Sequence, residues 1–151
     1  MKTKLILVFT FLVSLTFYSQ TIAIPDSNFE QALIDLGWDT NGLNGNILTT
    51  EAQAIDSLKI GNPVTNDSIP NVAAKIKSIV GVAAMTNLTY LNLRDNEISE
   101  VDLSVNTNLE YVDFSRNQFT TIDLSQNAQL ISLQLSDNAL TTLDISSLTE
   151  L

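Results

Sequence analysis

A repeat of 21 residues in the second half of the chain restricts its fold more than any other feature. At that spacing residues 88–151 align with themselves, so that Leu91, Val112 and Leu133, for example, share one column. A repeat this short cannot enclose a core alone and must bury its apolar residues against the next copy. The spacing therefore predicts a solenoid of stacked coils.

Each coil carries two short pairs of apolar residues at alternate positions, Leu91-x-Leu93 and Val101-x-Leu103 in the first copy. This alternation is typical of a strand with one buried face. We expect both pairs to form parallel strands, each about 4.8 Å from its copy in the next coil. The leucine columns would then merge into one core.

Asparagine recurs where the chain bends after the first pair, at Asn96, Asn117 and Asn138. We expect these side chains to form a structural ladder that satisfies backbone groups at the bend, because an unpaired buried amide costs roughly 1 to 3 kcal/mol. A second asparagine column holds Asn106 and Asn127.

The pattern Leu88-x-x-Leu91-x-Leu93-x-x-Asn96-x-Ile98, which recurs twice more, resembles that of the leucine-rich repeat family. With the segment 24–30 (IPDSNFE) ahead of it, the chain is similar to secreted leucine-rich repeat proteins of Bacteroidetes-type bacteria. The resemblance implies a repeat solenoid, a β-rich parallel-stranded coil, with a short N-terminal α-helical cap. Family members often carry cysteine in a column that is apolar here, so nothing that depends on that cysteine transfers to this chain.

The sequence divides into four segments, of which residues 1–20 have the profile of a signal peptide. Lys2 and Lys4 precede an apolar run at 5–18, which is too short to span a membrane. We expect export to the extracellular space, the cell surface or the periplasm, with no membrane span after cleavage. The other segments are an N-terminal cap region at 24–54 with a helix at about 26–36, a degenerate first repeat at 55–87 whose insertion at about 63–74 loops out, and three leucine-rich repeats at 88–151.

The expected cap helix opens with a capping motif. Asp26 or Ser27 would be the N-cap, and Glu30 would complete a capping box with Ser27 while staying solvated. Gly37 would end the helix.

The segment 38–48 after this helix allows two interpretations. Asp39, Asn41, Asn44 and Glu51 resemble the ligands of a calcium loop, but their register is one residue out of place. Two successive glycine-containing turns fit the same residues without a metal.

Composition excludes several classes of function. The net charge is −10, with 7 Lys and Arg against 17 Asp and Glu, so we expect no nucleic-acid partner. Without cysteine or histidine the chain cannot form disulfides, thiolate or imidazole metal sites, or a Ser-His-Asp triad. We expect no cofactor.

Alternation along the first strand of each coil identifies the side chains that face outward. By resemblance to the family, this row is where a protein or carbohydrate ligand binds. The stacked tyrosines of the row suit either a binding hot spot or simple stabilisation of the sheet. The candidate binding residues are Tyr90, Asn92, Arg94, Tyr111, Asp113, Ser115, Ser132, Gln134 and Ser136.

A second outward column contains only carboxylates, Asp102, Asp123 and Asp144, each followed two residues later by a serine. Neighbouring carboxylates repel, so something must offset the repulsion. Hydrogen bonds from serine hydroxyls and turn amides would do so; a bridging calcium ion is the alternative.

The leading hypothesis is an exported, non-enzymatic module for protein–protein or protein–glycan recognition. A structural spacer or coat element of a larger surface protein is the alternative. A glycoside hydrolase comes third, with Asp113 and Asp123, or Asp102 and Asp123, as paired carboxylates. Leu151 opens a new repeat, so we expect a truncated C-terminus, fraying after about Asn138, and end-to-end self-association through the uncapped last coil.

Overall fold

The computed structural model describes residues 20–151. The signal-peptide prediction for 1–20 lies outside these residues apart from Gln20. Within the described range, no helix combines the length and apolarity needed to cross a membrane.

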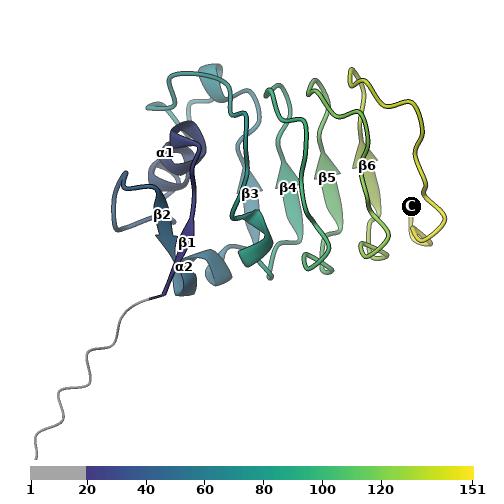
Figure 1. Ribbon diagram of the computed structural model, residues 1–151, viewed down its shortest axis with the longest axis horizontal. Coiled ribbons are helices and arrows are strands. Elements are labelled where there is room, and N and C mark those ends of the chain that lie inside the picture. The colour runs from purple at the N-terminus through teal and green to yellow at the C-terminus, as the bar shows by residue number, and fades with distance from the viewer. Residues whose placement is uncertain (1–19) are drawn as a thin grey trace, which may run out of the picture.

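Four parallel strands lie side by side along the long axis of the molecule, one from each coil (Figure 1). Leu58 pairs with Leu91, Leu91 with Val112, and Val112 with Leu133, so residues in one column of the sequence form one row in space. The stacking that the 21-residue spacing predicts is therefore confirmed. The strands are β3 (Ser57–Lys59), β4 (Tyr90–Asn92), β5 (Tyr111–Asp113) and β6 (Ser132–Gln134).

The second apolar pair of each coil does not form a strand, so the expectation of two strands per coil was wrong. Residues 101–103 and their copies have no strand assignment. The N–H of Ser104 donates to Oδ1 of Asp102 at 3.0 Å, and the N–H of Asn106 donates to the carbonyl of Leu103 at 3.0 Å. The backbone therefore turns here, and these N–H groups are not free to pair with the next coil.

The leucine columns form a continuous core that thins toward the C-terminus. Leu91 and Val112 are fully buried, and Leu133 is half-buried. In the following turn Leu143 and Ile145 are 41% and 49% exposed.

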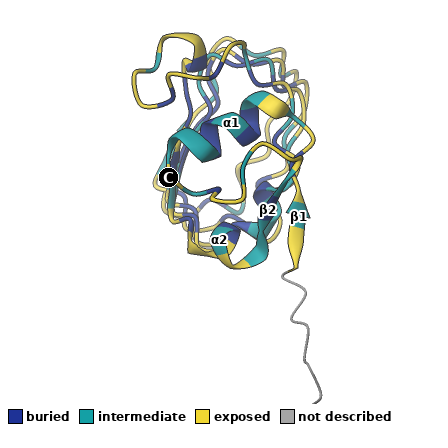
Figure 2. Cartoon of the chain, turned by 90° about the vertical axis from the view of Figure 1, so that its left-hand side faces the viewer, coloured by how far each residue is buried: buried dark blue, intermediate teal, exposed yellow. Residues whose placement is uncertain are grey.

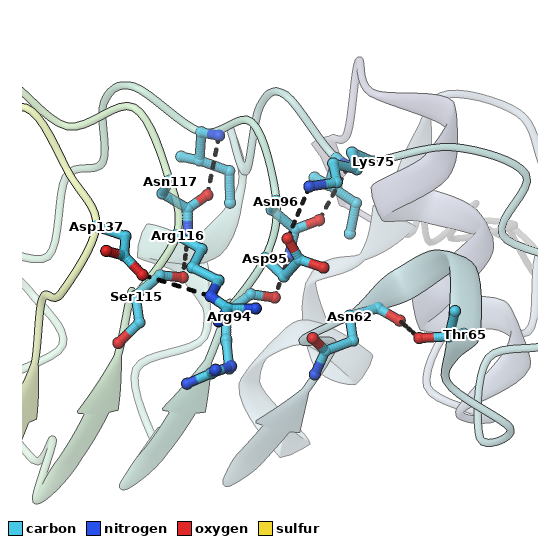
Figure 3. A network of polar contacts seen from close by, with 12 residues as sticks. Asn62, Thr65, Lys75, Arg94, Asp95, Asn96, Ser115, Arg116, Asn117 and Asp137 are labelled. Carbon is cyan, nitrogen blue, oxygen red and sulfur yellow. Dashed lines mark hydrogen bonds and ion pairs between the residues drawn. The ribbon is translucent and has the colours of Figure 1, made fainter.

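In the coils of β4, β5 and β6, one asparagine binds the backbone of two coils at the bend after the strand. The Nδ2 of Asn117 donates to the carbonyl of Leu93 in the preceding coil at 2.9 Å and to that of Phe114 in its own coil at 3.1 Å. Its Oδ1 accepts the N–H of Ile98 at 3.0 Å. Asn96 and Asn138 repeat this arrangement, and Figure 3 shows the first two members.

The third residue after each of these four strands takes a left-handed backbone conformation. Asn62, Asp95, Arg116 and Asp137 have φ angles of 50°, 59°, 58° and 58°. Asparagine and aspartate tolerate this region, whereas arginine adopts it at some cost in energy. The recurrence shows that every coil makes the same sharp bend.

The N-terminal segment covers the first coil. Figure 2, viewed along the stack, shows α1 (Ser27–Asp35) lying across the open end of the coils. Phe29 and Leu33 on this helix are fully buried in the core. Beside it, β1 (Thr21–Ala23) and β2 (Asn46–Leu48) form an antiparallel pair, followed by α2 (Thr49–Ala54).

Glu30 does not form the predicted capping box and is not solvated. Asp26 caps α1 alone, accepting the N–H groups of Asn28 and Phe29. Glu30 is 2% exposed, and its Oε1 accepts three backbone N–H groups from the turn at 44–46, at 2.8, 2.6 and 3.0 Å. Sequence spacing favoured a local cap, but a turn 14 residues away supplies more donors.

The insertion of the first repeat does not simply loop out. It begins with η1 (Pro63–Thr65) and returns Ile69 and Val72 to the core, where they are 0% and 5% exposed. A second short helix, η2 (Val82–Ala84), follows before β4. The insertion is therefore anchored beside the strands, where its polar residues can line a site.

The asparagine ladder makes a testable prediction. Asn117→Ala removes four hydrogen bonds and leaves buried backbone groups unpaired, so it should lower the free energy of unfolding by about 3 kcal/mol. The control is Asn108→Ala at the end of the preceding coil, which removes one exposed hydrogen bond and should cost less than about 0.5 kcal/mol. Urea denaturation measures both, and equal losses would contradict the assignment.

The Glu30 carboxylate gives a second prediction. Glu30→Gln keeps the shape of the side chain but removes the charge from three hydrogen bonds, which should destabilise the fold by about 1 to 2 kcal/mol. Glu100→Gln at an exposed position is the matched control and should have little effect. Thermal denaturation of the two variants is the measurement. An unchanged melting temperature for Glu30→Gln would show that the turn at 44–46 is stable without the charge of this carboxylate.

Candidate binding site on the strand face

Two tyrosines form an aromatic stack on the outward face of β4 and β5. The register pairs Tyr90 with Tyr111, and their ring centroids lie 4.3 Å apart with planes tilted by 1°. Both side chains are only partly buried. The same in-register pairing that aligns the leucines inside the coil therefore aligns these rings outside it.

Polar groups hold the two ends of the stack. The Nζ of Lys59 on β3 lies 5.2 Å from the centroid of the Tyr90 ring, within the range of a cation–π interaction. At the other end, Nε2 of Gln134 on β6 donates to the hydroxyl of Tyr111 at 3.1 Å. Burial and the neighbouring Tyr90 raise the pKa of Tyr111, so its hydroxyl stays neutral at physiological pH. The stack is thus fixed in place and retains hydrogen-bonding hydroxyls.

A polar groove adjoins the stack on its N-terminal side. It has a volume of about 520 Å³ and lies between the strand face at Lys59, Tyr90 and Asn92 and the insertion at 61–68. Gly61 forms part of its floor, and a Cβ atom at this position would come within 2.4 Å of Oδ1 of Asn92. The absence of a side chain there gives Asn92 its position.

The structure places most of the nine candidate residues at the surface, but it corrects two of them. Asp113 and Ser115 are 4% and 2% exposed, although they occupy outward positions. Asp113 lies between Asn92 and Gln134 in the row, and its Oδ1 accepts the N–H of Ser115 at 2.9 Å. Alternation gives the direction of a side chain but not the cover that its neighbours provide. Tyr90, Asn92, Arg94, Tyr111 and Ser132 are half-buried, and Gln134 and Ser136 are exposed.

Lys59 and the wall of the groove are not among the residues predicted from the sequence. Ser57 and Lys59 belong to the outward row, since β3 pairs with β4 at Ser57 and Tyr90 and at Lys59 and Asn92. The half repeat around Leu58 could have predicted the outward position of Lys59, because Lys59 follows the inward-facing Leu58 and side chains alternate along a strand. The insertion carries no periodicity, so nothing in the sequence showed that it lies beside the strands.

The aspartate column forms a row of separate serine-capped turns. Asp102 accepts hydrogen bonds from the hydroxyl and N–H of Ser104, at 2.6 and 3.0 Å, and these lower its pKa below the ordinary 3.8. Serine donors likewise lower the pKa of Asp123 and Asp144, although their neighbours in the column act on Asp123 in the opposite direction. Hydrogen bonding therefore outweighs the mutual repulsion without an ion.

The glycine turns after α1 hold a buried carboxylate. Gly42 and Gly45 have φ angles of 87° and 85°. Asp39 is 4% exposed, its Oδ1 accepts the N–H of Asn41 at 3.1 Å, and burial raises its pKa. Across residues 20–151, no group of three or more acidic side chains is arranged to hold a metal ion, at these turns or in the aspartate column.

The carboxylates considered for hydrolysis lack the geometry of a glycosidase. A general acid needs a pKa raised by burial, and its partner must face it across a cleft. Asp102 and Asp123 are exposed and have lowered pKa values. Asp113 is buried, with its oxygen bound to the backbone. The strand face therefore offers binding groups rather than a catalytic pair.

Comparison with protein families matches residues 75–127 to the model described as leucine-rich repeats in two copies. That match covers β4 and β5 with Asn96 and Asn117 of the asparagine ladder. The fold is a leucine-rich repeat solenoid.

Two solved structures from Listeria monocytogenes resemble this leucine-rich repeat solenoid. They are the functional domain of InlJ, which includes a cysteine ladder (TM-score 0.73, 28% identity), and the internalin InlF (TM-score 0.66, 25% identity). The matches cover 88% and 89% of this chain, which spans only 28% and 37% of theirs. This chain has no cysteine and so has no counterpart of the InlJ ladder. None of the curated proteins matches it.

The aspartate column predicts a pH dependence of stability. A carboxylate whose pKa is lowered by folding stabilises the protein above its ordinary pKa of 3.8, and that contribution is lost as the pH falls through the lowered value. The Asp102→Asn, Asp123→Asn, Asp144→Asn triple variant should therefore lose less stability than the unmodified protein between about pH 4 and pH 2. The measurement is the melting temperature of both proteins across this pH range. An equal fall in melting temperature for the variant and the unmodified protein would contradict the prediction.

Proposed function

We propose that the chain is an exported, non-enzymatic recognition module that binds a protein partner through the strand face around Tyr90 and Tyr111. The observation that carries the proposal is the tyrosine stack, held between Lys59 and Gln134 beside the polar groove. Tyrosine is enriched at binding hot spots because it offers a large apolar surface and a hydroxyl at low entropic cost.

Three features support binding over a purely structural role. The rings are partly exposed rather than packed into the core. Their side chains are fixed by neighbours before any partner arrives, which reduces the entropy lost on binding. The repeats also present the row on a rigid sheet, as expected for a leucine-rich repeat solenoid with a family resemblance to binding modules.

Export rests on the sequence of residues 1–20, whose basic start and apolar run are typical of a signal peptide. We place the module outside the cytoplasm on that basis. A spacer or coat element is the competing role, because a solenoid can also serve only to set a length.

A binding comparison separates recognition from the spacer role. Three proteins would be immobilised: the unmodified protein, the Tyr90→Ala/Tyr111→Ala variant, and a control variant, Asn108→Ala/Gln126→Ala, whose substitutions lie outside the strand face. Each would be exposed to proteins from the surroundings of the producing cells. A specific partner should bind the unmodified protein and the control equally, and bind the tyrosine variant at least about 30-fold more weakly, as the loss of a hot spot of about 2 kcal/mol implies.

The stability of the tyrosine variant must be checked in the same experiment. Loss of the aromatic pair should cost about 1 kcal/mol, so the circular dichroism spectrum should remain that of the folded protein. A folded tyrosine variant that retains every bound protein would overturn the proposal and favour the spacer role. The proposal would also be overturned if the strand face bound only a glycan, with the tyrosine variant losing that glycan and no protein partner found.

A further inference from the structure

The charges of this protein are distributed unevenly. The chain has a net charge of −10, so most basic side chains have an acidic partner close by. Three of the five basic residues in the described part form ion pairs: Lys75 with Asp95, Lys77 with Glu97, and Arg116 with Asp137. Within residues 20–151, Lys59 and Arg94 are the two that form none.

These two residues belong to the outward row of β3 and β4, where Lys59 pairs with Asn92 and Arg94 lies two residues further along. Lys59 projects from β3 over the Tyr90 ring, and Arg94 follows the end of β4. Gly61 makes room for Arg94, since a Cβ atom at Gly61 would lie 3.3 Å from the Cβ of Arg94. In Figure 3 the Arg94 side chain extends over the strands, away from the ion pairs of the turns.

The acidic groups near this face form no ion pair with Lys59 or Arg94. Asp113 is 4% exposed, and one of its oxygens accepts the N–H of Ser115. Asp67 belongs to the exposed insertion that forms the opposite wall of the groove. Neither forms an ion pair with Lys59 or Arg94. The strand face therefore carries, beside the tyrosine stack, the two basic side chains of residues 20–151 that form no ion pair.

This arrangement of Lys59 and Arg94 beside the tyrosine stack suits carboxylates presented by a partner. The guanidinium of Arg94 can bind a carboxylate in a two-pronged arrangement, and the ammonium of Lys59 is held over an aromatic ring in advance. The acidic remainder of the molecule would repel an acidic partner that docked elsewhere, which favours this one orientation. Peptide carboxylates match the proposed protein partner, whereas neutral ligands would leave two desolvated cations without counter-charges.

We propose that Lys59 and Arg94 make the strand face selective for an acidic segment of the partner protein, rich in Asp or Glu, which lies across the tyrosine stack. This inference rests on the proposed function and specifies the chemistry of its partner. Lys59 and Arg94 supply the charge recognition, and Tyr90 and Tyr111 supply the contact area.

The test uses the full chain and two synthetic octapeptides, one of alternating Glu and Ser and one with Gln in place of Glu. Binding is measured by titration calorimetry and by NMR of the Tyr90 and Tyr111 ring protons. We expect the Glu peptide to bind at least about tenfold more tightly than the Gln peptide, and its affinity to fall with added salt. Equal affinity for the two peptides, or no binding of either, overturns the inference.

A matched pair of variants locates the effect. Lys59→Gln/Arg94→Gln should weaken binding of the Glu peptide at least about tenfold. Lys77→Gln/Arg116→Gln changes the net charge by the same amount at ion-paired positions and should leave binding within about twofold. Equal loss in the two variants would mean that only the overall charge matters, and would overturn the inference.

Two further measurements separate this inference from the proposed function. A partner that requires the tyrosines but binds the Lys59→Gln/Arg94→Gln variant unchanged would overturn the inference and leave the recognition role intact. Polygalacturonate that binds through Lys59 and Arg94 when the Glu peptide does not would overturn it in favour of an acidic glycan. Failure of the tyrosine comparison would instead count against the recognition role itself.

Discussion

The structure depends on satisfying the backbone groups that each coil turns toward the interior at its bend. A solenoid without long strands has few ladder hydrogen bonds, so these groups have no partner in the sheet. In the coils of β4, β5 and β6 one asparagine meets the need, because its amide donates to carbonyls of two coils while its oxygen accepts an N–H. The same side chain thus shapes the bend and ties each coil to its neighbour. The leucine columns supply apolar burial, but the asparagines determine where the chain turns and in what register it stacks.

The same stacking register determines which side chains are neighbours on the exposed strand face. Because the coils repeat at 21 residues, Tyr90 lies directly beside Tyr111, and the row continues to β3 on one side and β6 on the other. The insertion of the first repeat is the one large departure from regularity among the described coils, and it builds the wall of the groove beside Tyr90. Recognition by this chain is therefore proposed where a regular sheet, an aromatic stack and an irregular loop meet, with unpaired Lys59 and Arg94 on the same face.

The sequence predicted the features that periodicity encodes and missed those that depend on contacts between distant segments. The pairing of Leu91 with Val112 followed from spacing alone. The absence of strands around Val101 could not be read from alternation, because there Asp102 and Ser104 engage the backbone locally. Glu30 was expected to cap its own helix, but a turn far along the chain offered three donors. On the strand face, the direction of each side chain was predictable, whereas the cover over Asp113 and the groove wall were not, since both arise from packing.

The measurement that tests the account most directly is the stacking register in solution. Nuclear Overhauser contacts should connect the backbone of Leu91 to that of Val112 and the backbone of Val112 to that of Leu133, and the ring protons of Tyr90 to those of Tyr111. That pattern would place the asparagine ladder and the tyrosine stack where the account requires them. Contacts offset by one residue, which would turn the leucines outward, or no contacts between residues 21 apart, would contradict it.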